Sequence, residues 1–445
     1  MLEYYCDNWW SGSLPGTEKG PLSFLYPVAS SPSRHLYCFS TPFILIPMER
    51  IRIKHFGPIG EGLQDTAQEY LNIDKLTVFV GEQGTGKSAV AKLYATFAWI
   101  EKSIVQNKFS CGQFDASTFS SLLGFYRMEG YLRDATEIDY IGDGISLSYR
   151  NSVLQVKEIN LEKYILPKIQ YIPAERNLVG VIDKYEQISY LPESLQDFLF
   201  VYDRAVQSDC IQNIGLPICG LQVKFDKASH SVKLFNDTHS ILLTEASSGL
   251  QSFVPCFVVS KFLVNEIFSG RQGVTFKNLS ERQEFERQFV QDLGYSPASD
   301  TELLEYAKKV AHRFFNSCVI QILEEPEQNL FPASQKQMLF DLLQDLNRSN
   351  HNKTLITTHS PFLLPYINVA MKAFELSAAG GDVSSLVPEG ACIDASAVNV
   401  YEFREGCIIP LEKKRNISSD ENMLNEELEK TNELFRALLW AGKRD

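Results

Sequence analysis

The chain has 445 residues, a length that allows two or three domains and a large buried core. Its content of 44% hydrophobic and 22% charged residues is that of a globular protein, and no run of 18 apolar residues indicates a membrane span. The formal net charge of −13 argues against broad non-specific binding to nucleic acid, although a local basic groove is not excluded. The nine cysteines are scattered without a C-x-x-C pair, which favours reduced thiols and a cytoplasmic location.

Residues 1–47 differ in composition from the rest of the chain. They hold six prolines and nine aromatic residues and show neither helical nor alternating periodicity. One hypothesis is that Met48 is the natural start and that residues 1–47 do not belong to the native protein. The alternative is an interaction arm rich in aromatic residues. We expect residues 48–445 to form one domain, which opens on a strand in which Ile51 and Ile53 alternate with basic residues.

A short apolar run, residues 76–80, leads into "GEQGTGKS" and then into a helical pattern. This is a strand-to-helix turn that matches G-x-x-x-x-G-K-[ST], in which backbone N–H groups and a helix N-terminus surround a phosphate. Lys87 is expected to reach the β- and γ-phosphates of ATP, and the Ser88 hydroxyl to contact Mg²⁺. The residues predicted to bind the nucleotide are Gly81, Gly84, Gly86, Lys87, Ser88 and Ala89.

Between this loop and residue 245, two further segments have recognisable secondary-structure patterns. Residues 137–160 alternate around glycine and asparagine turns and predict antiparallel strands within an insert near 105–165. Residues 190–207 have proline and glutamate at their third and fourth positions, which mark a helix start, and predict a helix. There are no sustained heptads from 100 to 245, which excludes long coiled-coil arms there.

"EASSGLQSF" stands directly before an apolar helical stretch that continues to residue 259. Ser247 and Gly249 at this helix N-terminus predict a phosphate contact, although a simple serine N-cap explains the same pattern. A second insert, near 268–316, contains two amphipathic charged segments, 279–293 and 300–315. They are either a helical lobe that binds a partner or a plain solvated helical pair.

The segment "CVIQILEEPEQNLFP" is a near-continuous apolar run that ends in two glutamates, as expected of a buried parallel strand. Two acids at that position indicate a cation or a solvent-filled site. We expect Glu324 to contact Mg²⁺ through water and Glu325 to polarise the attacking water. His359 follows the next predicted strand, at the sheet edge where ligands of α/β proteins collect, and is a candidate γ-phosphate sensor.

The last part of the chain is expected to add a hairpin about Arg404–Gly406 and a closing helix. In that helix Leu424, Leu428, Phe435 and Leu439 make one apolar face, which predicts packing on the ATPase domain.

In their order, "IRIKHFGPI", "GEQGTGKS", "ASSGLQ", "ILEEPEQNLFP" and "ITTHSPFLL" resemble the ATP-binding-cassette class of P-loop ATPases. Within it, the chain is similar to the branch that includes chromosome-maintenance heads and the OLD-like ATPases of bacterial defence, and "IQYIPAERN" also resembles this branch. The resemblance implies an α/β P-loop fold with a mixed sheet, an antiparallel β lobe and helical insertions.

By this resemblance, the Walker A loop is Gly81 to Ser88, Glu324 is the Walker B acid and Glu325 the catalytic glutamate. His359 is then the switch histidine, Ser247 and Gly249 are signature residues, and Gln170 is a lid glutamine that contacts the metal. Two departures from the family pattern are Glu324, where most members have aspartate, and Leu250, where a glutamate or glutamine is usual.

The resemblance also implies that two heads sandwich two ATP molecules, giving a homodimer or a higher homo-oligomer. The implied function is an ATPase that is the sensor or motor of a multi-protein system, of anti-phage defence or DNA processing, without a membrane role. Only 86 residues follow His359, too few for a fused nuclease domain, so a separate effector such as a nuclease is expected and nucleic acid is a possible ligand. The alternative is an ATP-gated scaffold with little turnover that holds and releases an effector.

Overall fold

The computed structural model describes residues 49–65, 68–161, 164–182, 185, 188, 190–268, 279–309, 315–414, 417–418 and 422–441. The chain divides into two units, Met1–Pro47 and Met48–Asp445. The two hypotheses for residues 1–47 lie outside the described residues, all of which belong to the second unit.

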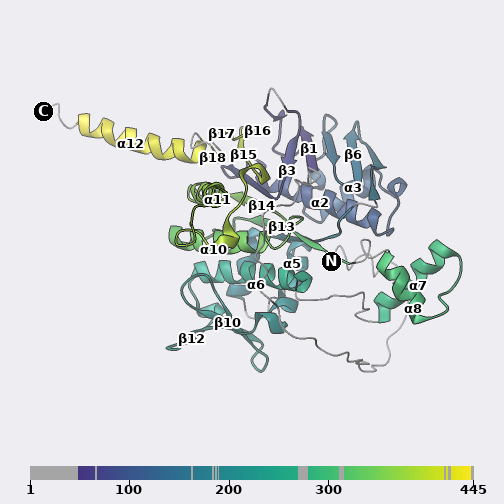
Figure 1. Cartoon of the computed structure of the whole chain (residues 1–445). Coiled ribbons are helices and arrows are strands. Elements are labelled where there is room, and N and C mark those ends of the chain that lie inside the picture. Colours follow the sequence, from purple (N-terminus) through teal and green to yellow (C-terminus); the bar gives the residue numbers. More distant parts are fainter. Residues whose placement is uncertain are drawn as a thin grey trace. The chain divides into compact units, whose positions relative to one another are not determined.

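A seven-stranded mixed sheet forms the centre of this unit (Figure 1). Its strand order is β2 (Gly62–Leu63), β16 (Cys407–Pro410), β15 (Val398–Arg404), β4 (Leu76–Gly81), β14 (Lys353–Thr358), β13 (Cys318–Glu324) and β8 (Pro167–Ile172). The five strands from β15 to β8 are parallel, so their carboxyl ends meet at one edge. β4, β13 and β14 are buried along their whole length, as expected of central parallel strands, although in β14 only Leu355 and Ile356 are aliphatic.

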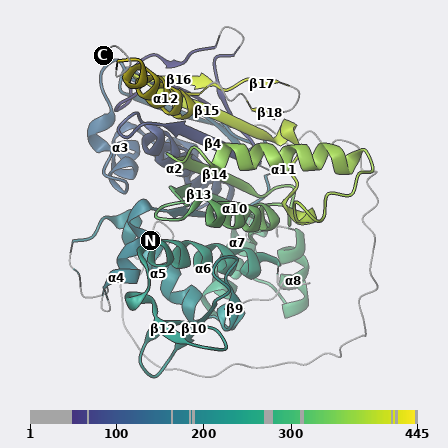
Figure 2. The ribbon, with the colours of Figure 1, turned by 90° about the vertical axis from the view of Figure 1, so that its left-hand side faces the viewer.

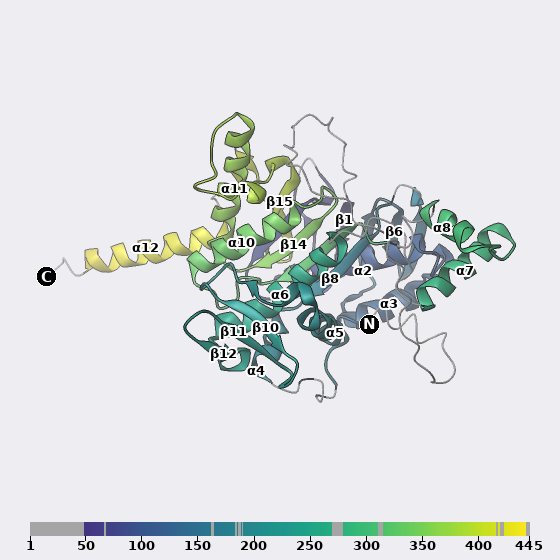
Figure 3. The ribbon, with the colours of Figure 1, turned by 60° about the horizontal axis from the view of Figure 1, so that its bottom comes forward.

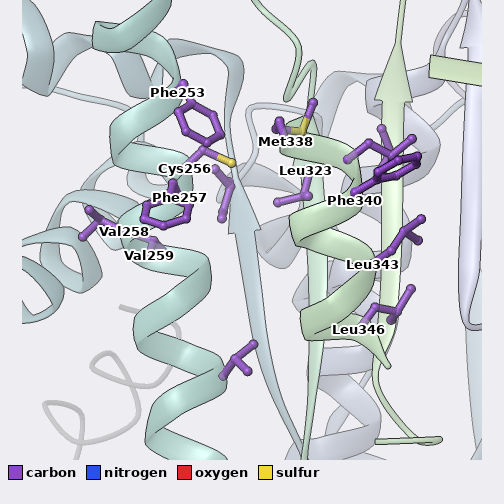
Figure 4. Packing of buried hydrophobic residues seen from close by; sticks show 14 of the residues in the cluster. Phe253, Cys256, Phe257, Val258, Val259, Leu323, Met338, Phe340, Leu343 and Leu346 are labelled. Atoms are coloured by element: carbon purple, nitrogen blue, oxygen red, sulfur yellow. The ribbon is translucent and has the colours of Figure 1, made fainter. Parts of the chain in front are cut away.

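The strand register decides which side chains share a face of this sheet. Leu323 pairs with Ile172 on one side and Ile356 on the other, and all three belong to the core that includes residues of α6 (Ser248–Phe268), α10 (Pro332–Leu346) and α11 (Leu363–Ala378). Figure 2 shows these three helices, and Figure 4 shows Leu323 between side chains of α6 and α10. Helix α2 (Lys87–Val105) packs against β4, β8, β13 and β14. Lys92 of α2 lies 3.9 Å from Glu324. Since Glu324 follows Leu323 directly and so projects from the other face of the sheet, α2 covers the face opposite to α6.

A second, antiparallel sheet has the order β3 (Leu71–Ile73), β1 (Glu49–Lys54), β5 (Glu137–Ile141), β6 (Ile145–Arg150) and β7 (Val153–Glu158). The antiparallel strands expected in 137–160 are therefore confirmed. Within the insert near 105–165 the structure also has the short helix α3 (Ala116–Gly124), whose N-cap Asp115 accepts a bond from the Thr118 N–H.

A third sheet was not predicted from the sequence. β9 (Ile214–Gly215), β10 (Gln222–Asp226), β11 (Ser231–Phe235) and β12 (Ser240–Leu242) pair antiparallel directly before α6 (Figure 3). It follows the expected helix in 190–207, which is confirmed as α5 (Glu193–Gln207), and the short α4 (Leu178–Val181). The strands at its two ends are very short, which explains why no clear alternation marks them.

The insert near 268–316 contains α7 (Leu279–Leu293) and α8 (Asp300–Lys309), joined by an ion pair of 2.6 Å between Arg282 and Asp300. Residues 269–278 and 310–314 lie outside the described part. Both amphipathic helices are thus confirmed, with the second one described only to Lys309.

The predicted hairpin about Arg404–Gly406 is confirmed: β15 and β16 pair across Glu405 and Gly406, which both have positive φ. The strands β17 (Lys413–Lys414) and β18 (Ile417–Ser418) follow. The last helix, α12 (Met423–Ala441), does not pack as expected. Leu424 touches the core, but Leu428, Phe435 and Leu439 are 55%, 62% and 53% exposed, so the prediction of a closing helix packed along its length is wrong.

Among the described residues, one helix, α6, is long and apolar enough to cross a membrane. Of its most apolar stretch, 72% is buried inside this unit, and its Phe253, Phe257 and Val259 belong to the core shown in Figure 4. A buried core helix satisfies the same criterion of length and composition.

Candidate functional site

The turn between β4 and α2 has the backbone that its glycines predict. Gly81, Gly84 and Gly86 all have positive φ, of 149°, 76° and 105°. A Cβ at position 81 would lie 2.5 Å from the Phe403 carbonyl oxygen, and one at position 86 would lie 2.6 Å from Ile59 Cδ1. Only glycine fits both the backbone conformation and the space at these two positions.

Lys87 lies inside this turn and is 5% exposed. Its Nζ donates to the Gly81 and Glu82 carbonyl oxygens, at 2.7 and 2.6 Å, and so fixes the curvature of the loop. Burial lowers the pKa of Lys87 to about 8, against the opposing charges of Glu325, Glu327 and Glu324. At neutral pH the side chain is therefore a largely protonated cation beside an acidic cluster.

Lys87 is also the first residue of α2, so the loop ends at a helix N-terminus. Gly86 occupies the N-cap without a side-chain bond, and its carbonyl accepts the Val90 N–H. The N–H groups of the first helical residues, which include Ser88 and Ala89, have no partner within the helix and are oriented toward the loop. The structure therefore brings the predicted nucleotide-binding residues together in one turn.

Glu324 ends β13 with its carboxylate on the face of the sheet that α2 covers. It is 4% exposed, and its Oε2 accepts the Ala174 N–H at 3.4 Å. Its Oε1 lies 3.9 Å from Lys92 Nζ and has no hydrogen-bond partner among the described residues. A buried carboxylate oxygen without a donor is costly unless a cation or a cation-bound water meets it. The residues present therefore fit the predicted Mg²⁺.

Glu325 follows directly but has a different backbone and environment. Its φ is 43°, a left-handed conformation that is rare for glutamate, and its Oε1 lies 3.2 Å from His359 Nε2. The hydrogen bond from His359 lowers the pKa of Glu325, with further help from the charges of His359, Lys87 and Arg176 against partial burial. The carboxylate is thus ionised at neutral pH and held beside the predicted switch histidine.

Glu327 is a site residue to which the sequence pattern assigned no role. It is buried, and its Oε1 accepts bonds from Thr358 Oγ1, at 2.5 Å, and from the His359 N–H, at 3.1 Å. Burial raises the pKa of Glu327, against those bonds. The side chain ties the end of β14 to the loop after β13, and so positions His359. The third glutamate in "EEPEQ" was the available sequence signal.

Arg176 is the second such residue and is fully buried. Its guanidinium donates to the carbonyl oxygens of Glu324 and Glu325, both at 2.6 Å. It also donates to the carbonyl oxygens of Pro173, at 3.0 Å, and Ser252, at 2.9 Å. The only sequence signal was its place in "PAERN", a segment that the resemblance includes without assigning a role.

Ser247 and Gly249 stand at the start of α6, where Ser247 is exposed and its carbonyl accepts the Gln251 N–H. A Cβ at position 249 would lie 2.7 Å from the Asn329 carbonyl oxygen, so this helix start packs tightly on the loop after β13. Among the described residues, the close contact of Gly249 is with that loop, and no hydrogen bond joins Ser247 or Gly249 to the turn 81–88 of the same chain.

Gln170 is not brought to the metal site. Gln170 pairs with Gln321 of β13, so these two side chains project from the same face of the sheet. Glu324 is three residues after Gln321 on the same strand and therefore projects from the opposite face. Its amide nitrogen bonds to the Tyr171 carbonyl, at 3.0 Å, and to Asp197 of α5, at 3.4 Å. The predicted metal contact is therefore wrong in this structure, because the strand register turns the side chain away.

Comparisons with known proteins give one family match, an AAA ATPase domain over residues 303–364, which contains Glu324, Glu325 and His359. No curated protein is significantly similar to the chain. The chain also resembles a number of solved structures at low sequence identity, three of which follow.

The first is the SMC head domain from Thermotoga maritima, at 9% identity and a TM-score of 0.36, covering 83% of this chain and 100% of that chain. The second is the Smc head domain with an extended coiled coil bound to the C-terminal domain of ScpA derived from Pyrococcus furiosus, at 10% and 0.35, covering 87% and 99%. The third is a nucleotide-free ATP-binding cassette from an ABC transporter, at 11% and 0.27, covering 83% and 92%. With such low scores, the functional argument stands on the site itself.

Proposed function

We propose that this protein binds ATP with Mg²⁺ and hydrolyses it. The observation that carries the proposal is the convergence of a glycine loop around Lys87 with the ionised Glu325 carboxylate, which lies 3.2 Å from His359 Nε2. The AAA ATPase match over residues 303–364 supports it independently of the loop.

In this proposal each part of the site has one task. The N–H groups of residues 84–89 and the Lys87 ammonium bind the β- and γ-phosphates. Ser88 and Glu324 hold Mg²⁺, which neutralises phosphate charge when it is bound. Glu325 accepts the proton of the attacking water, and His359 orients that carboxylate and contacts the γ-phosphate.

The exposed start of α6 supports a second step of the proposal. Ser247 is free of the loop 81–88 of its own chain, and a helix N-terminus is suited to bind a phosphate. We place it against the ATP of a second copy, so that ATP joins two heads and hydrolysis separates them. Such a cycle suits the sensor or motor of a cytoplasmic multi-protein system, of anti-phage defence or DNA processing, with a separate effector such as a nuclease.

The test compares ATP turnover and solution mass for the wild type and Glu325→Gln. The amide keeps the shape of the site but removes the base, so turnover should fall by about 10²–10⁴-fold while ATP affinity is retained. The mass by light scattering should double in ATP and stay doubled in the variant. Glu375→Gln on α11, where Glu375 pairs with Lys372 on the surface, is the matched control and should behave as the wild type.

Equal turnover in wild type and Glu325→Gln refutes the role of Glu325. ATP binding without any turnover in the wild type, with or without double-stranded DNA, favours the ATP-gated scaffold over the hydrolase. A mass that stays monomeric in ATP refutes the pairing of heads while leaving the nucleotide site intact.

A further inference from the structure

We propose that Arg176 is a positioning residue that couples the first turns of α6 to Glu325, so that displacement of this helix changes the place of the water-activating carboxylate. The inference deepens the proposed hydrolysis and rests on it for its functional meaning. Its structural part, the coupling itself, stands on contacts that are independent of turnover.

The contacts of Arg176 select a guanidinium rather than any long side chain. Four bonds of 2.6–3.0 Å go to backbone carbonyls that come from three segments: Pro173, the pair Glu324 and Glu325, and Ser252 of α6. A fully buried cation is costly to desolvate, and an aliphatic side chain would fill the same volume without that cost. The planar fork of donors is the feature that a methionine or a lysine cannot reproduce.

Arg176 helps to fix the unfavourable backbone conformation of Glu325. The φ of 43° is unfavourable for a residue with a side chain, and such conformations persist only where neighbours fix them. Here the Glu325 carbonyl accepts from Arg176 Nη2 at 2.6 Å and from the Gln328 N–H at 3.0 Å, and the Glu325 N–H donates to the Thr357 carbonyl at 2.9 Å. Arg176 supplies one of these three restraints, and it is the one that also reaches α6.

At α6, a second set of contacts ties the same loop to the same turn of the helix. Ser252 accepts from Arg176 at its carbonyl oxygen, and its hydroxyl accepts the Asn329 amide at 3.1 Å. Gly249 lies against the Asn329 carbonyl with no room for a Cβ. The loop from Glu324 to Asn329 therefore moves with the start of α6, which carries the exposed Ser247. In this proposal a phosphate that binds at Ser247 displaces the start of α6, the helix to which Arg176 donates a hydrogen bond.

The experiment uses the full chain and three variants of Arg176. Arg176→Met and Arg176→Lys should lower turnover by about 10²-fold while ATP affinity changes little, since the carboxylate is misplaced and the phosphate loop is untouched. The carbonyl oxygens that lose a donor should lower the melting temperature, so turnover is measured well below it, where both variants are folded. Arg176→Ala leaves space beside the same carbonyls, so guanidinium at concentrations well below those that unfold proteins should restore part of its turnover, and sodium chloride should not.

The matched control is Arg348→Met. Arg348 also bonds to α6, at Asn265 with 3.0 Å, and lies over the Phe268 ring, but it is at the far end of the helix from the loop. Its replacement should leave turnover unchanged.

A second readout does not need turnover. Amide hydrogen exchange over residues 324–330 should become faster in Arg176→Met, because one restraint on the loop is lost, and stay at the wild-type rate in Arg348→Met. If the wild type itself shows no turnover while this exchange difference is present, the hydrolysis proposal fails and the coupling by Arg176 stands. Unchanged exchange over 324–330, or a loss of turnover that results only from unfolding and is not restored by guanidinium, overturns the inference.

Discussion

The buried ion pair between Lys353 and Glu49 offers a quantitative test of how the sheets are joined. Lys353 is the first residue of β14 and Glu49 the first of β1, and they are 7% and 2% exposed. Lys353 Nζ lies 3.0 Å from Glu49 Oε1, and the Tyr94 hydroxyl of α2 donates to Glu49 Oε2 at 2.5 Å. The perturbation is Lys353→Met, which keeps the apolar stem and leaves the Glu49 carboxylate buried and uncompensated.

The geometry sets the magnitude. At 3.0 Å the attraction is about 5 kcal/mol for an effective dielectric constant near 20. Removal of one partner of a buried pair generally costs about 3–5 kcal/mol, a large fraction of a domain stability of about 5–15 kcal/mol. Burial alone would lower the pKa of Lys353, but the charges of Glu49 and Asp143 raise it above its ordinary 10.5. Stability from a raised pKa is complete below the unfolded value of 10.5 and is lost as the pH rises through the folded value, so the pair contributes fully at neutral pH.

The assay is urea unfolding at pH 7, which should give a loss of about 3–5 kcal/mol in the free energy of unfolding for Lys353→Met. The double variant Glu49→Gln/Lys353→Met should recover much of this loss, because no uncompensated charge remains and Tyr94 keeps an acceptor. Lys372→Met, which breaks the exposed pair with Glu375, is the control and should cost at most about 1 kcal/mol. A loss below about 1 kcal/mol for Lys353→Met, or additive effects in the double variant, would refute the reasoning.

The other predictions concern the site. Lys87→Ala should abolish ATP binding by calorimetry, because it removes the cation at the centre of the loop; unchanged affinity contradicts the phosphate-loop assignment. His359→Ala should slow hydrolysis and leave ATP affinity nearly unchanged, and an equal loss of both would show that His359 only supports the fold. Gly249→Ala should cost about 1–3 kcal/mol in urea unfolding, since the new Cβ would lie 2.7 Å from a backbone oxygen, and a neutral result means that α6 and the loop separate easily.

The sequence predicted the elements whose patterns are local. The loop 81–88 is defined by residue types at fixed spacing, and the strands β4 and β13 by short apolar runs, while β14 was indicated only by Leu355 and Ile356. Because the carboxyl ends of parallel strands meet at one edge, the sequence alone predicts that Glu325 and His359 lie at the same edge of the sheet.

Long-range features were beyond local patterns. The apolar stripe of α12 shows that the helix has an apolar face but not what covers it, and here most of that face is exposed. The orientation of Gln170 depends on the register of β8 against β13, because a shift of one residue would move its side chain to the other face of the sheet. Arg176 and Glu327 act through backbone groups far away in the chain, and such contacts leave no spacing signal.

The backbone at Glu325 has a consequence for how substitutions there should be ranked. At a φ of 43°, asparagine and glycine are better suited to the chain than glutamate is. Selection for stability alone would replace Glu325, and a chain that retains it gives up conformational free energy, of order 1–3 kcal/mol, for a carboxylate in that place. Replacements that improve the fold at this position are therefore the ones that remove the carboxylate, so if Glu325 activates water as proposed, a more stable protein and an active one are opposite choices at a single residue.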